Sequence, residues 1–108
     1  MTKIHLSPRA RGDLRAIKTY IALDLSNPKA AQDALARIAK RLQDLDLFPD
    51  IGAPLDLIID IKTDYRFLVC DNYTVFYRHE TEEIFIDRIL YGKQDFIKVL
   101  FGFSEYQQ

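Results

Sequence analysis

Three arginines in the carboxyl-terminal half of the chain have the type and spacing to bind an anion. Arg66, Arg78 and Arg88 each lie in a short stretch rich in β-branched and aromatic residues. If these stretches are neighbouring strands of one sheet, the three side chains can lie side by side on one face. Guanidinium groups present planar sets of N–H donors that match carboxylate and phosphate oxygens. Three arginines arranged in such a row would form an anion-binding surface.

Arg88 also has a structural interpretation. It stands between Ile86 and Leu90, so strand alternation places it on an apolar face, where an unpaired charge is costly. A carboxylate near Asp87 in the chain, or one such as Asp95, would then pair with it. A structural ion pair and a contact with a partner protein both stay open for this residue.

Other residue types argue against several classes of chemistry. Cys70 is the only cysteine, and His5 and His79 are the only histidines. The chain therefore lacks a multi-cysteine metal site and a Ser/His nucleophile signature. Its four glycines form no phosphate-binding loop. We expect no metal and no cofactor, and we interpret His79 as a solvated turn residue.

The composition is that of one compact domain spanning residues 1–108. The chain has 48% hydrophobic and 29% charged residues, which is typical of globular proteins. No apolar run approaches the roughly 20 residues of a membrane helix, and the first residues lack a secretory signal. We therefore expect a cytoplasmic protein without membrane contact.

The net charge of −1 is divided unevenly along the chain. Residues 1–48 contain nine Lys or Arg against five Asp or Glu, whereas residues 49–108 contain six against eleven. The overall balance argues against a general nucleic-acid binder, which is usually basic throughout or over one face. A local basic patch in the amino-terminal half remains open.

The element order predicts an α+β fold. A short strand at 3–6 precedes two helices, each opened by a capping residue and a proline, at Ser7-Pro8 and Asn27-Pro28. Apolar residues recur at spacings of three and four in both helices, which predicts an antiparallel helical hairpin. They are Leu14, Ile17, Ile21 and Leu25 in the first helix, and Ala31, Leu35, Ile38, Leu42 and Leu45 in the second.

The second half predicts a three-stranded antiparallel meander. Residues 65–69, 73–78 and 84–91 are strand-like and are separated by short polar turns. Residues 95–101 form a short terminal helix or extension. We expect the helices on one face of the sheet.

Two surfaces are candidate interfaces. Basic residues on the two helices would meet an acidic partner or form only solvated helix faces. They are Arg11, Arg15, Lys18, Arg37, Lys40 and Arg41. The apolar tail exceeds what a small domain can bury, so it would contribute to a partner groove or a homodimer contact. Its residues are Phe96, Val99, Leu100, Phe101 and Phe103.

The chain resembles the RelE/ParE family of bacterial toxins over nearly its whole length. The likeness lies in the element order and in four motifs: Leu47-Phe48-Pro49 followed by Gly52, Tyr65-Arg66, Tyr73-Thr74-Val75-Phe76-Tyr77-Arg78, and Ile86-Asp87-Arg88-Ile89-Leu90-Tyr91-Gly92-Lys93-Gln94-Asp95. The last run is similar to the ParE-like signature. The resemblance implies a type II toxin held inactive by a cognate antitoxin, with operator DNA reached only through that antitoxin. In this setting Phe96, Val99, Leu100 and Phe101 are candidate antitoxin contacts.

The family has two activities. RelE-like members cut mRNA in the ribosome, and under that alternative Arg66, Arg78, Tyr91 and Lys93 are the catalytic candidates. ParE-like members act on DNA gyrase without catalytic residues, and then Arg66, Arg78, Arg88, Tyr91 and Lys93 are candidate target contacts. The chain departs from the nuclease pattern, because Val69, Cys70 and Thr74 stand where catalytic arginines are expected. We therefore favour the ParE-like branch. A degenerate toxin that only binds antitoxin is a further alternative.

Overall fold

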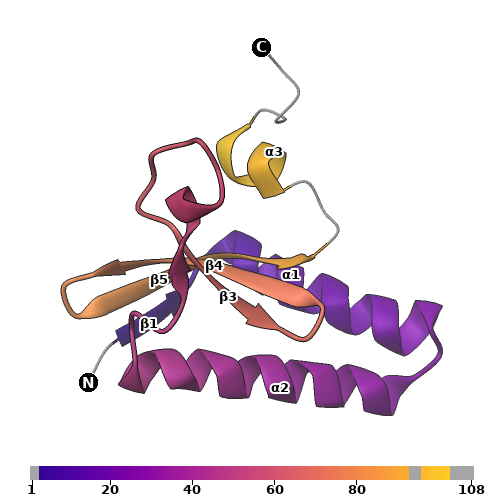
Figure 1. Cartoon of the computed structure of the whole chain (residues 1–108). Coiled ribbons are helices and arrows are strands. Elements are labelled where there is room, and N and C mark those ends of the chain that lie inside the picture. The colour runs from indigo at the N-terminus through magenta and orange to yellow at the C-terminus, as the bar shows by residue number, and fades with distance from the viewer. Residues whose placement is uncertain (1–2, 93–95, 103–108) are drawn as a thin grey trace.

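A computed structural model describes residues 3–92 and 96–102 of the chain. A five-stranded sheet lies on a long helical hairpin, and a short third helix lies on the other side of the sheet (Figure 1). The α+β architecture expected from the sequence is confirmed. None of the described helices is both long enough and apolar enough to cross a membrane.

The first strand and helix begin where the sequence signals place them. Strand β1 spans Lys3–Leu6 and helix α1 spans Pro8–Thr19. The Ser7 hydroxyl accepts a hydrogen bond from the Ala10 N–H at 2.9 Å, which satisfies one of the unpaired donors at the helix start. Pro8 follows at the first helical position, where its missing N–H costs nothing.

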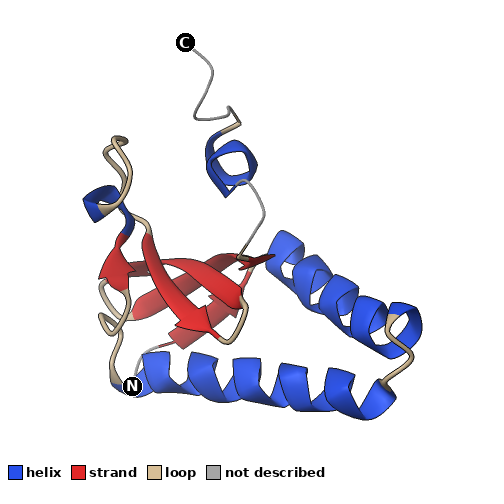
Figure 2. Cartoon of the chain, turned by 45° about the vertical axis from the view of Figure 1, so that its right-hand side comes forward, coloured by secondary structure: helices blue, strands red, loops and turns tan. Residues whose placement is uncertain are grey.

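The hairpin is confirmed, but its tip differs from the expected pattern. Residues Tyr20–Asp24 form a π-helical turn before α2, which spans Pro28–Leu47 and is capped by Asn27. The wider turn changes the direction of the following side chains. Leu25, expected in the buried stripe, is consequently 55% exposed. Figure 2 shows one long helix running beneath the sheet and the other beside the sheet, with a short loop joining them.

The meander is confirmed and extended by a strand at each side. Strand β3 spans Arg66–Cys70, β4 spans Tyr73–Glu80 and β5 spans Glu83–Tyr91. The order is β1-β5-β4-β3-β2. Strand β1 pairs in parallel with β5, and the two-residue strand β2, Ala53–Pro54, pairs antiparallel with β3.

The sheet separates two apolar clusters. The larger one lies between sheet and hairpin and contains the fully buried Tyr77 and Ile38. The smaller one lies on the outer face, where Leu55, Phe76 and Leu90 are buried under helix α3, Phe96–Phe101. Burying a large apolar side chain contributes roughly 1.5–3 kcal/mol. The small cluster therefore suffices to hold α3 on the sheet.

A register shift in β5 determines which side chains reach the outer face. Phe76 pairs with Arg88, whereas the next residue, Tyr77, pairs with Ile86. Asp87 is the extra residue of this β-bulge. Bulges redirect side chains from simple alternation, and here Asp87 and Arg88 both line a cleft on the outer face.

Candidate functional site

The outer face carries a polar cleft between the start of α1, the bulge in β5 and helix α3. The cleft encloses about 400 Å³. It is lined by Ser7, Pro8, Arg9, Tyr65, Asp87, Arg88, Val99 and Leu100. It therefore brings together two kinds of residue expected from the sequence, a target-contact arginine and two residues of the apolar tail.

Asp87 is the centre of this cleft. Its carboxylate Oδ2 accepts hydrogen bonds from the Tyr65 hydroxyl at 2.8 Å and from Arg78 Nε at 3.1 Å. The Ser7 hydroxyl donates to its backbone carbonyl at 2.8 Å, which joins the start of α1 to the bulge. We call Tyr65, Arg78 and Asp87 the Asp87 cluster.

The surroundings of Tyr65 make its hydroxyl a poor proton acceptor. Burial, and then the hydrogen bond to Asp87, raise the pKa of Tyr65 to about 12. A phenol with that pKa stays protonated at neutral pH and cannot serve as a general base. The Arg78 guanidinium lies 5.2 Å from the centre of the Phe85 ring and also faces Glu80 at 3.7 Å. The cluster therefore has the chemistry of a contact surface.

Arg66 does not belong to that surface. It pairs with Tyr77, which points into the hairpin-side core, whereas Arg78 pairs with Phe85 on the opposite face. Directly opposed residues of antiparallel strands point to the same side. The Nη2 atom of Arg66 donates to Gly52 O at 2.8 Å and to Asp50 O at 3.2 Å. Arg66 thus holds the segment that follows α2.

Arg88 has a carboxylate partner that the sequence analysis missed. Its Nε and Nη2 atoms donate to the two carboxylate oxygens of Asp13 at 2.8 and 2.7 Å. The Ile89 N–H donates to Asp13 Oδ2 at 2.9 Å. The structural ion pair is confirmed, with Asp13 of α1 as the partner. Asp95, the carboxylate named from the sequence, lies outside the described residues.

The expected row of Arg66, Arg78 and Arg88 is therefore wrong as a single surface. The three guanidinium groups lie on two faces of the sheet, and each is engaged by oxygens of this chain. An added anion would have to displace those oxygens. Simple alternation missed this arrangement because the bulge and the long-range partners override it.

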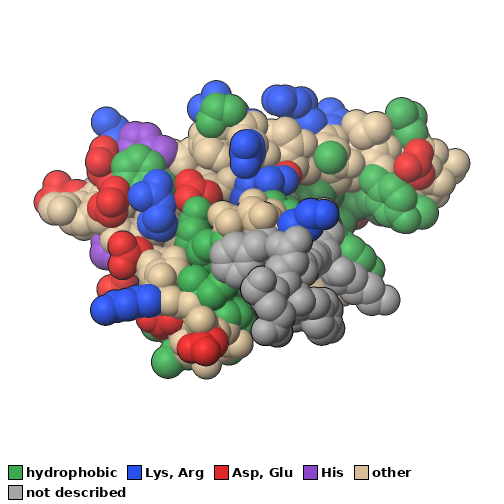
Figure 3. All heavy atoms as spheres, turned by 90° about the horizontal axis from the view of Figure 1, so that it is seen from above, with side chains coloured by type: hydrophobic (Ala, Val, Ile, Leu, Met, Phe, Trp, Pro, Cys, Tyr) green, Lys and Arg blue, Asp and Glu red, His purple; other side chains and the backbone are tan. Residues whose placement is uncertain are grey.

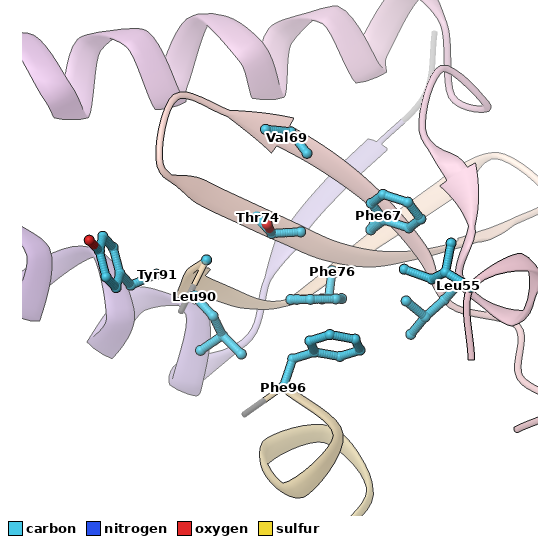
Figure 4. A pocket seen from close by; sticks show the side chains of 10 residues that line it. Leu55, Phe67, Val69, Thr74, Phe76, Leu90, Tyr91 and Phe96 are labelled. Carbon is cyan, nitrogen blue, oxygen red and sulfur yellow. The ribbon is translucent and has the colours of Figure 1, made fainter. Parts of the chain in front are cut away.

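Tyr91 lies away from the arginines, and Lys93 lies outside the described residues. Tyr91 pairs with Tyr73 at the far end of β5 from Phe85, about 20 Å along the strand from the Arg78 pairing. Its ring approaches Tyr73 edge-on, with 6.1 Å between centroids. Figure 4 shows the Tyr91 ring directed away from the neighbouring apolar side chains. Tyr91 and Arg78 therefore share no site.

The apolar tail is partly buried, which corrects the expectation that it is left exposed. The Phe96 ring stacks on Phe76 with 5.3 Å between centroids, and Phe101 meets Tyr65 edge-on at 5.9 Å. Val99 and Leu100 are half-buried in the same cluster. Phe103 lies outside the described residues. The role of this tail as an antitoxin contact stays a prediction.

Beside α3 the outer face also has a small apolar cavity of about 120 Å³ (Figure 4). Phe67, Phe76 and Phe96 line it together with Leu55 and Leu90. Its rim carries exposed apolar side chains, with Val69 54% and Ile58 60% exposed. Such a rim is typical of a surface that another protein covers.

His79 is not the solvated turn residue expected from the sequence. Its Nδ1 lies 2.8 Å from Asp50 Oδ1 and its Nε2 lies 3.0 Å from the Thr81 carbonyl oxygen. It therefore joins the end of β4 to the segment after α2. In the part of the chain that the structure describes, no group of three or more His, Cys, Asp or Glu could hold a metal ion.

The comparisons with known proteins agree with this geometry. A chain from the chromosomal ParDE toxin–antitoxin system of P. aeruginosa has a similar structure, with a TM-score of 0.67 and 24% sequence identity. The match covers 84% of this chain and 96% of that one, and it shows a shared fold. No curated protein sequence matches the chain.

A match to a protein-family model shows which family the chain belongs to. The model of the ParE toxin of the type II toxin–antitoxin system parDE matches residues 4–96. The chain belongs to the ParE toxin family, and it is the toxin component of a type II toxin–antitoxin module. A cognate antitoxin is therefore its partner.

Proposed function

We propose that this toxin inhibits growth by binding DNA gyrase, as the resemblance to the ParE-like branch implies. The main support is the Asp87 cluster. Its carboxylate already accepts from Tyr65 and Arg78, and the high pKa of Tyr65 keeps its hydroxyl protonated. A ribonuclease needs a base that takes up the proton of the attacking ribose hydroxyl, and Tyr65 does not supply one. Inhibition by binding has no such requirement.

Cells that express the toxin test this proposal. We expect DNA replication to stop and cells to filament while incorporation of labelled amino acids continues at first. RNA sequencing within minutes of induction distinguishes the alternative, because a RelE-like nuclease leaves messages cut in phase with codons. Phased cleavage with normal plasmid supercoiling would contradict the gyrase proposal.

We also propose that the antitoxin covers the outer face beside α3. The exposed side chains of Val69 and Ile58 surround the apolar cavity, and α3 continues the same apolar surface. A partner that buries these side chains gains the transfer free energy of their apolar area. The test is calorimetry with the cognate antitoxin.

Two substitutions make this test specific. Val69→Asp is expected to weaken antitoxin binding about 100-fold, which corresponds to about 3 kcal/mol. Leu47→Asp at the end of α2 is the control, because Leu47 is 73% exposed and lies outside the cavity. Equal affinity for both variants, with both folded, would remove the cavity rim from the antitoxin interface.

A further inference from the structure

Helix α1 carries four exposed cations that lack ion-pair partners among the described residues. They are Arg9, Arg11, Arg15 and Lys18. The cations of α2 differ, since Lys29 pairs with Asp33 at 3.4 Å and Lys40 with Asp44 at 3.8 Å. The one acidic residue of α1, Asp13, is turned to Arg88. The positive charge of this helix is therefore not neutralised within the described chain.

Three of these cations, Arg11, Arg15 and Lys18, lie on one side of α1, away from Arg9. Their spacing of four and three residues places them within about 60° around the helix axis, because each residue turns by about 100°. From Arg11 to Lys18 they span about 10 Å along the axis at ~1.5 Å per residue. Figure 3 shows basic side chains following one another along the margin of the molecule where α1 runs. We call Arg11, Arg15 and Lys18 the α1 cation stripe.

The side chains on one flank of the stripe are small, whereas on the other flank Leu14 is packed against the core. Gly12 and Thr19 lie next to Arg15 on the exposed side of the helix, at spacings of three and four residues. Glycine weakens a helix interior, and packing does not require it here. A Cβ at Gly12 would meet only Arg15 Nη2, at 3.9 Å. The absence of a side chain leaves room for close approach from outside the molecule.

We propose that the α1 cation stripe contacts the phosphate backbone of duplex DNA. Each strand of a duplex carries one phosphate charge per ~3.4 Å of the duplex axis, so the three cations of the stripe can neutralise up to three phosphates. Single-stranded nucleic acid is bound mainly by stacking on aromatic rings, and the stripe contains none. An acidic protein partner would favour an apolar centre within the interface, and the stripe itself contains no apolar side chain. The chemistry of the stripe thus matches a regular row of phosphates best.

Salt-dependent binding to a 24-base-pair duplex of mixed sequence tests this proposal, with the full chain and fluorescence anisotropy as the readout. Neutralising three phosphates predicts a slope of about −2.7 for log K against log salt, or about 40-fold weaker binding between 50 and 200 mM salt. The triple variant Arg11→Gln, Arg15→Gln, Lys18→Gln is expected to lose this binding. The control Lys29→Gln, Lys40→Gln, Lys62→Gln removes the same charge elsewhere and is expected to retain it.

Two single substitutions test the geometry of the stripe. Gly12→Glu places a carboxylate beside Arg15 and is expected to weaken DNA binding at least tenfold, whereas Gly12→Ala should bind nearly as the parent chain does. Melting curves establish that both variants are folded.

Several results would overturn the proposal. They are no binding of the duplex at 50 mM salt, equal losses in the stripe and control variants, or equal affinity for a single strand of the same length. Equal affinity for a polyglutamate peptide of the same charge would assign the stripe to an acidic protein instead. None of these measurements involves gyrase, so the outcome is independent of the gyrase proposal.

Discussion

Arg88 and Asp13 form a two-point ion pair that fastens helix α1 to strand β5. The pair joins residues 75 positions apart in the sequence, and the same carboxylate also accepts from the Ile89 N–H. The Arg88 side chain is 22% exposed and that of Asp13 is 13% exposed. Loss of one partner leaves the other charge partly buried without compensation.

Arg88→Ala is therefore expected to lower the free energy of unfolding by about 3 kcal/mol. Urea denaturation measures this change. Lys62→Ala, an exposed lysine in the loop before β3, is the control, with an expected change within about 0.5 kcal/mol. Equal midpoints for the two variants would show that the pair contributes little to the fold.

Two glycines give opposite predictions for the same substitution. A Cβ at Gly52 would lie 2.6 Å from Phe67 O and 2.7 Å from the Tyr77 hydroxyl oxygen. That hydroxyl donates to Pro49 O at 2.9 Å and accepts from the Gly52 N–H at 3.0 Å. Gly52→Ala should destabilise the chain by about 2 kcal/mol because backbone and a buried ring would have to shift.

Gly12→Ala is the matched substitution for Gly52→Ala, because a Cβ added at Gly12 would meet only Arg15 Nη2, at 3.9 Å. It should stabilise the chain by up to about 1 kcal/mol through the higher helix propensity of alanine. Thermal melts of the two variants should shift in opposite directions. Shifts of the same sign would refute the contrast between the two positions.

Alkaline pH should weaken the fold through Tyr65. The pKa of this phenol is raised from its ordinary value of 10.0 to about 12 by burial and by Asp87. A group whose pKa is raised on folding stabilises the protein fully below its unfolded pKa and loses that contribution as pH rises through its folded pKa. The loss is thus expected between about pH 10 and 12.

Tyr65→Phe isolates this contribution. Its free energy of unfolding should fall less between pH 10 and 12 than that of the parent chain, and a spectrophotometric titration should lose one late-titrating tyrosine. Tyr20→Phe is the control, because Tyr20 is 53% exposed at the hairpin tip. Identical alkaline slopes for the Tyr65 variant and the parent chain would contradict the role assigned to the hydrogen bond with Asp87.

Local signals in the sequence were sufficient to predict the hairpin and the meander. Ser7, Pro8 and Asn27 act on adjacent backbone, and the apolar periods of the helices and strands differ clearly. The parallel pairing of β1 with β5 depends instead on contacts about 80 residues apart. The two-residue strand β2 is too short to have a periodic signal.

The candidate site was predicted less well because it, too, depends on contacts between residues far apart in the sequence. Arg66, Arg78 and Arg88 were recognised by type, but the bulge at Asp87 and the partner Asp13 decide where they point. Tyr65 and Asp87 belong to the motifs that carry the family resemblance, but the sequence pattern assigns no role to either residue. A partly buried carboxylate flanked by a tyrosine and an arginine is formed only when three separate segments meet.

Supercoiling by purified gyrase tests the central claim most directly. The toxin is added to gyrase, ATP and relaxed plasmid, with and without an excess of its antitoxin, and the topoisomers are separated by electrophoresis. We predict loss of supercoiling in proportion to toxin and its recovery with antitoxin. Tyr91→Phe should inhibit as the parent chain does, because it retains the ring that meets Tyr73. Unchanged supercoiling at a toxin concentration that yields phased mRNA cleavage in a translation extract would contradict the account.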